Sequence, residues 1–200
     1  MSIDAEKLCA LVSSRICHDV INPLGAIGNG LELLSLGGDL SGPEIDLIDA
    51  SHKNAEARVK FLRHAFGETG IGATINGQDV EKTAQNYCAT SNIKARLKLA
   101  NSLPRPEVKR TYLAIMCMMQ TLSFGGDIHV SQSNSGWKIV GNAERRRNIK
   151  DLWTALLIND FSTLEIEASN IQFVLLSLEL SKAHKIPMLQ ENETSITVEF

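Results

Sequence analysis

The sequence predicts an α+β protein in which an N-terminal antiparallel helical hairpin precedes a C-terminal α/β sandwich. Apolar residues at helical spacing fill positions 1–70, and a glycine-rich stretch at 67–78 interrupts them. The remainder alternates strand-like and helix-like segments. Net charge changes at the same break, from −4 over residues 1–70 (six basic and ten acidic side chains) to +1 over the rest. We therefore predict two domains, 1–70 and 71–200.

The hairpin is predicted from its capping residues and its apolar spacing. Asp4 or Ser2 can cap a first helix that Gly37 and Gly38 end, and Pro43 suits the first turn of a second helix. Seam positions in the second helix, apolar except for His52, recur at alternating steps of three and four, as in a coiled coil: Ile45, Ile48, His52, Ala55, Val59, Leu62 and Phe66. Two helices alone bury too little apolar surface to be stable, so we expect a homodimer with a four-helix bundle.

The second domain is predicted to place helices on one face of a small mixed sheet. The pattern predicts helices near 79–91, 106–123, 149–158 and 169–184, strands near 94–99, 186–190 and 195–200, and a β-hairpin over 128–140. Three methionines on the second of these helices, Met116, Met118 and Met119, are expected to fill the core.

Composition excludes several classes of partner. A net charge of −3 over 200 residues argues against a protein that binds the nucleic-acid backbone. No apolar run is long enough for a membrane span, and the N-terminus lacks the basic start of a signal peptide. Four cysteines without CxxC spacing favour reduced thiols and a cytoplasmic location, and no histidine has a partner at metal-ligand spacing.

His18 is the candidate functional residue of the first helix. At about 100° per residue, the apolar stripe of this helix lies roughly 120–180° away from His18; it comprises Val12, Ile16, Val20, Ile27, Leu31 and Leu34. His18 is therefore expected to project from the polar flank. Pro23 predicts either a kink one turn below the histidine, at a cost of roughly 3 kcal/mol, or a helix that ends near Ile21 and restarts.

The motif His18-Asp19-x-x-Asn22-Pro23-Leu24 resembles the H-box on the dimerising hairpin of histidine kinases. The kinase nucleotide boxes do not follow. The matching helix, 112–123, has methionine and other apolar residues in place of asparagines, and Gly141-Asn142-Ala143 stands in place of Asp-x-Gly-x-Gly. The chain is therefore similar to the ChpT-type histidine phosphotransferases of bacterial phosphorelays, which join the hairpin to a degenerate kinase-ATPase-like domain. The likeness extends over nearly the whole chain, through 14–34, Gly125-Gly126 and 170–173.

This resemblance implies a homodimer that needs no ATP. It would take a phosphoryl group from the receiver domain of a hybrid histidine kinase and pass it to the receiver domains of response regulators, in a pathway that controls the cell cycle. No cofactor is intrinsic to such a protein, and Mg²⁺ would come with the partner's receiver domain. Two other functions remain open: a divergent histidine kinase that still binds ATP, and a non-catalytic dimeric scaffold for response regulators.

We expect His18 to be the phosphoacceptor, aided by neighbours on its own helix. Arg15 lies one turn before it and is expected to neutralise phosphate oxygens or contact the partner; Asn22 lies one turn after it and is expected to hydrogen-bond the same group. Because adjacent helix positions diverge, Asp19 is expected to orient the ring through water or to bind a partner lysine or magnesium-linked group. The partner is expected to dock on Leu11, Ser14, Ile21 and Gly25.

Overall fold

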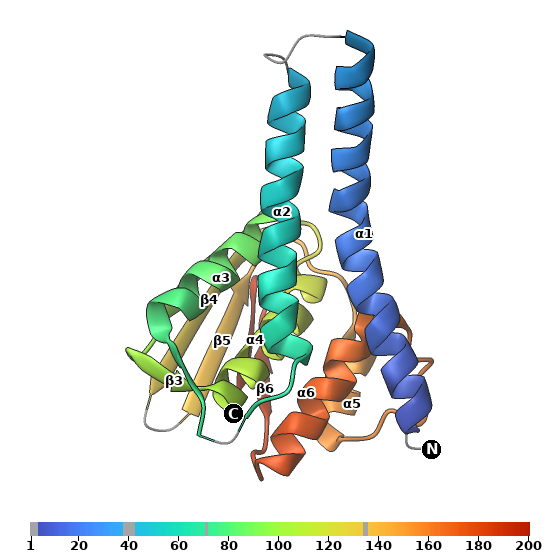
Figure 1. The fold of residues 1–200 in the computed structure, drawn as a ribbon. Helices are drawn as coiled ribbons and strands as arrows, with labels where there is room; N and C mark the ends of the chain where they lie inside the picture. The colour runs from blue at the N-terminus through green and yellow to red at the C-terminus, as the bar shows by residue number, and fades with distance from the viewer. Residues whose placement is uncertain (1–3, 38–42, 71, 134–135) are drawn as a thin grey trace.

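The computed structural model describes residues 4–37, 43–70, 72–133 and 136–200 (Figure 1). The predicted cap Ser2, the predicted stop at Gly38 and the loop 38–42 lie outside these residues. Helices are α1 (Ala5–Gly37), α2 (Pro43–Phe66), α3 (Gly77–Ala89), α4 (Arg105–Thr121), α5 (Lys150–Ile158) and α6 (Ile171–Lys182), with a 3-10 turn η1 (Ala168–Asn170) before α6. Strands are β1 (Thr74–Asn76), β2 (Ile93–Lys98), β3 (Ser102–Pro104), β4 (Gly126–Ser133), β5 (Gly136–Asn142), β6 (Met188–Glu191) and β7 (Ser195–Glu199).

The hairpin of α1 and α2 projects from the rest of the molecule, and its lower part lies against the helices α3, α4 and α6 (Figure 1). Asp4 caps α1 as predicted, because its Oδ1 accepts a hydrogen bond from the backbone N–H of Lys7 at 2.7 Å. α1 continues through Pro23, so the alternative of a helix that ends near Ile21 and restarts is wrong. The helix bends along its length, and its N-terminal part lies over α6 (Figure 1).

The second domain is built on a five-stranded sheet in the order β2-β4-β5-β7-β6. The β2–β4 pair is parallel and the other pairs are antiparallel. Alternate residues of β2 are buried and exposed, as expected for a sheet covered on one face. The fold therefore matches the predicted α+β class. The sequence did not predict β1 and β3, which pair with each other in a separate two-stranded sheet.

Aromatic stacking joins the hairpin to the second domain. Phe61 of α2 is fully buried between Tyr87 of α3 and Tyr112 of α4, with ring centroids 3.9 and 4.1 Å away. Nearby, Met116 and Met118 of α4 are buried in the same core, as predicted, and Met119 packs at its edge. The last turns of α2 thus belong to the core of the second domain.

Replacing Phe61 by alanine is expected to destabilise the protein strongly. Loss of both stacked contacts and the cavity left behind should lower the free energy of unfolding by about 4 kcal/mol. Urea unfolding followed by circular dichroism measures this change. Phe124→Ala is the matched control, because Phe124 is 56% exposed, and it should cost less than about 1 kcal/mol. Similar losses in both variants would contradict the central packing role of Phe61.

In the part of the chain that the structure describes, no helix combines the length and the apolar character that crossing a membrane requires.

Candidate functional site

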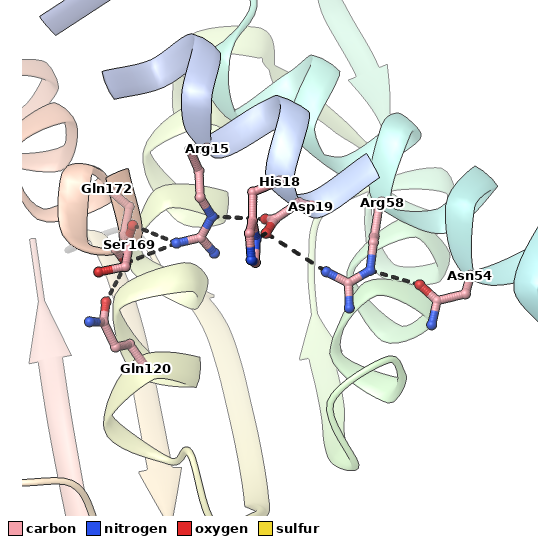
Figure 2. A network of polar contacts seen from close by, with 8 residues as sticks. All are labelled: Arg15, His18, Asp19, Asn54, Arg58, Gln120, Ser169 and Gln172. Atoms are coloured by element: carbon pink, nitrogen blue, oxygen red, sulfur yellow. Dashed lines mark hydrogen bonds and ion pairs between the residues drawn. The ribbon is translucent and has the colours of Figure 1, made fainter. Parts of the chain in front are cut away.

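His18 lies on α1 with 71% of its side chain exposed, which confirms that it projects from the polar flank. Its Nδ1 is 3.2 Å from Oδ1 of Asp19, the next residue (Figure 2). An ionised carboxylate can only accept hydrogen bonds, so this contact places the ring proton on Nδ1. The other ring nitrogen, Nε2, then carries the free lone pair.

Asp19 is buried and faces two arginines from the two helices of the hairpin. Its Oδ2 accepts a hydrogen bond from Nε of Arg15 at 2.8 Å, and its Oδ1 is 4.0 Å from Nη1 of Arg58 on α2. Arg58 is held in turn by Asn54, whose Oδ1 accepts from the arginine Nε at 2.7 Å. The carboxylate is thereby fixed from both sides.

The contact between His18 and Asp19 corrects the expectation for Asp19. Helical spacing led us to expect a contact through water or a partner group, but the two side chains turn toward each other and meet directly. The Asp19 side chain is only 6% exposed, and its predicted contact with a partner lysine or metal-linked group stays a prediction.

Arg15 points inward and connects the hairpin to the second domain. Its Nη1 donates to the backbone oxygen of Ser169 at 2.8 Å and to Oε1 of Gln172 at 3.4 Å (Figure 2). Burial by itself would lower the pKa of the Arg15 guanidinium, but the charge of Asp19 and the hydrogen bond to it, with a contribution from Tyr87, raise the pKa above its usual value. The contacts described for Arg15 are thus within the chain, and its predicted contact with phosphate or a partner stays a prediction.

Tyr87 interacts with the same cluster and is uncharged near neutral pH. Burial raises the pKa of its phenol to about 12, and the negative charge of Asp19 acts in the same direction. Because the phenol is neutral, the negative charge that faces Arg15 and Arg58 in the described contacts is that of Asp19.

The other predicted site residues divide into open and covered positions. Asn22, Ser14 and Ile21 are exposed, Ile21 to 61%. Gly25 faces open space, because a Cβ built there would meet no atom within 4 Å. Leu11, in contrast, packs against the apolar cluster at the start of α6, so it is a contact between domains rather than an open docking position. The exposed residues surround His18 on the free side of α1.

Sequence reasoning missed Arg58, Gln172 and the backbone oxygen of Ser169. Arg58 was missed because an arginine on a helix usually faces solvent. Ser169 and Gln172 were missed because they are more than 150 positions from Arg15 in the sequence. Their contacts depend on how α1 packs against α2 and α6, which no local spacing reveals. Among the residues the structure describes, no group of three or more histidine, cysteine or acidic side chains could hold a metal ion.

Comparison with known proteins places this geometry in a family. Residues 77–194 match the family model described as the histidine phosphotransferase C-terminal domain. A protein phosphotransferase ChpT from Brucella abortus (strain 2308) is 36% identical over 137 residues, which are 68% of this chain and 65% of that protein, so the chain aligns with slightly less than two thirds of that relative. A solved bacterial phosphotransferase, 28% identical, matches 100% of this chain and 98% of its own with a TM-score of 0.82, which confirms the fold of hairpin and sandwich together. The chain therefore belongs to the family of histidine phosphotransferases that carry this C-terminal domain.

Proposed function

We propose that the protein moves a phosphoryl group between receiver-domain aspartates through His18, without using ATP. The observation that carries this proposal is an imidazole that is 71% exposed while its Nδ1 is bound to a buried carboxylate. Such a ring offers Nε2 to a partner and cannot turn away from it freely. The similarity to a protein phosphotransferase over 68% of the chain supports the same activity.

The proposed reaction is an attack by Nε2 on the phosphorus of an aspartyl phosphate. A bond forms between Nε2 and phosphorus, the bond between phosphorus and the aspartate oxygen breaks, and the electron pair leaves with the receiver's carboxylate. The phosphorylated ring keeps its Nδ1 proton and carries a positive charge, which the carboxylate of Asp19 stabilises at 3.2 Å. Transfer to the next receiver is the reverse of these steps.

The proposal assigns the charge neutralisation at phosphorus mainly to the partner. Phosphoryl transfer proceeds through a loose transition state whose oxygens must be neutralised, and Mg²⁺ in the receiver's acidic pocket supplies this. On this chain, Asn22 is exposed one turn after His18, and we expect its amide to donate to a phosphate oxygen. The exposed positions Ser14, Ile21 and Gly25 are the proposed docking surface for the hybrid kinase receiver and the response regulators.

We also propose that two copies pair through the hairpin. Each helix carries apolar side chains that this single chain leaves uncovered: Leu24 and Leu31 of α1 are 51% and 55% exposed, and Ile45 and Val59 of α2 are 37% and 48% exposed. Leu24 and Leu31 are one heptad apart, and Ile45 and Val59 are two heptads apart, which is the spacing of residues in the seam of a helical bundle. A second copy would cover them and complete a four-helix bundle.

A charge in this seam is expected to separate the dimer. Leu31→Glu should convert a particle of twice 21.9 kDa into one of 21.9 kDa, because the bundle would have to bury an unpaired carboxylate. Size-exclusion chromatography with light scattering measures the mass. Asn29→Glu adds the same charge at an exposed polar position of α1 and should leave the dimer intact. A measured particle mass of 21.9 kDa for the wild-type protein would contradict the proposed dimer.

Two features remain proposals from the resemblance and the composition. A cytoplasmic location is supported by four free cysteines, of which Cys9 and Cys17 are exposed. A role in the control of the cell cycle rests on the resemblance to the ChpT-type proteins.

The activity is tested by offering the protein a receiver domain phosphorylated with radioactive phosphate, beside a sample that receives labelled ATP alone. The proposal predicts label on the protein from the receiver and none from ATP. Label from ATP would favour the divergent kinase, and no label from the receiver domains offered would favour the non-catalytic scaffold.

A further inference from the structure

The polar contacts around His18 continue into the second domain. Gln172 of α6 is 1% exposed, and its Oε1 accepts from Nη1 of Arg15 at 3.4 Å. Its Nε2 donates to the backbone oxygen of Ser169 at 3.1 Å and to Oε1 of Gln120 on α4 (Figure 2). Gln172 is therefore hydrogen-bonded at both ends of its amide, which defines its orientation.

Arg15 transmits this orientation to the site. Its guanidinium is a rigid planar fork, so holding Nη1 against Ser169 and Gln172 also fixes the direction of Nε. That Nε donates to Asp19, and the other oxygen of the same carboxylate meets Nδ1 of His18. A continuous set of hydrogen bonds thus connects a buried amide of the second domain with the imidazole.

The same contact between α1 and α6 also has an apolar part. Leu8, Leu11 and Val12 of α1 pack against a small cluster that includes Ile171 and Val174 of α6. Val174 is 5% exposed and takes no part in the hydrogen bonds described above. The polar and apolar parts of the contact can therefore be weakened separately.

We propose that Gln172 is a positioning residue for phosphotransfer: through Arg15 and Asp19 it sets the tautomer and orientation of His18. This inference rests on the proposed function and deepens it. The second domain then contributes to the chemistry of a histidine on the hairpin through a residue whose described contact with the hairpin is with Arg15.

Gln172→Met tests the proposal, because methionine keeps an unbranched buried side chain and removes the amide hydrogen bonds. The maximal transfer rate from a saturating phosphorylated receiver should fall about tenfold, because a small misalignment of a reacting group typically lowers a rate by about this much. The receiver concentration that gives half the maximal rate should not change, because Gln172 is buried away from the partner. Gln172→Glu keeps an acceptor for Arg15 but loses the donor to Ser169 and Gln120, so it should recover only part of the rate.

Val174→Ala is the matched control on the same helix. It weakens the apolar contact with α1 and leaves the hydrogen bonds in place, so the transfer rate should fall less than twofold. An equal loss of rate in Val174→Ala and Gln172→Met would overturn the proposal, because docking of α1 on α6 would then account for both.

Nitrogen-15 NMR of the His18 ring gives a second readout that needs no partner. Wild type and Val174→Ala should show the proton on Nδ1, and Gln172→Met should shift it toward Nε2. A ring that is identical in wild type and Gln172→Met would overturn the proposal. If the wild-type protein accepts no phosphate, the proposed function fails, whereas the NMR result still decides whether Gln172 positions His18.

Discussion

His18→Ala is expected to abolish acceptance of phosphate from a phosphorylated receiver, to below the limit of detection. The variant lacks the nitrogen that we propose forms the bond to phosphorus, and no other described histidine shares the contact of His18 with a buried carboxylate. Because the imidazole is 71% exposed, the free energy of unfolding should change by less than about 0.5 kcal/mol. Radiolabel transfer and urea unfolding measure the two quantities on the same preparation.

His52→Ala is the matched control for this experiment. His52 is an exposed histidine on the other helix of the hairpin, and its loss should leave transfer at the wild-type rate. Label that still reaches the His18→Ala variant would show that another residue is the acceptor and would contradict the assignment.

Asp19→Asn is expected to have the second largest effect, on transfer and on stability together. The amide nitrogen of asparagine can donate to Nδ1, which moves the ring proton to Nε2 and removes the lone pair that attacks phosphorus. We expect the transfer rate to fall on the order of 100-fold, because the ring would no longer be in the tautomer that can attack phosphorus. Rapid-quench measurement of transfer at saturating receiver gives this rate.

The same substitution leaves two arginines without their shared carboxylate. Since Arg15 and Arg58 keep 18% and 20% of their side chains exposed, the loss is smaller than for a fully buried pair, and the free energy of unfolding should fall by about 2 kcal/mol. Asp49→Asn removes a surface carboxylate that is 56% exposed and paired with Lys53, and it should change neither quantity measurably. Wild-type transfer by Asp19→Asn would show that Asp19 does not set the tautomer.

Features that depend on neighbouring residues could be predicted from the sequence. The cap at Asp4, the start of α2 at Pro43 and the exposure of His18 follow from hydrogen bonding and helical spacing within one segment. The strands β1 and β3 could not be predicted, because three residues carry no readable alternation and form a strand only by pairing with each other.

The site could be predicted only in part, since the proposed acceptor follows from a local motif and its supporting contacts do not. The H-box motif points to His18 as the proposed acceptor, but side-chain direction decides that Asp19 turns toward its neighbour. Arg58 and Gln172 reach the site through the packing of α1 on α2 and α6. Leu11 has the spacing of a docking residue, and only the position of the second domain shows that it is partly covered.

The most direct test of the account is to locate the phosphoryl group after transfer from a phosphorylated receiver. Phosphorus-31 NMR of the labelled protein, with peptide mapping of the same sample, distinguishes the residue and the ring nitrogen that carry it. The account predicts phosphate on Nε2 of His18, with the ring proton retained on Nδ1. Phosphate on Nδ1, or on any other residue, would contradict it.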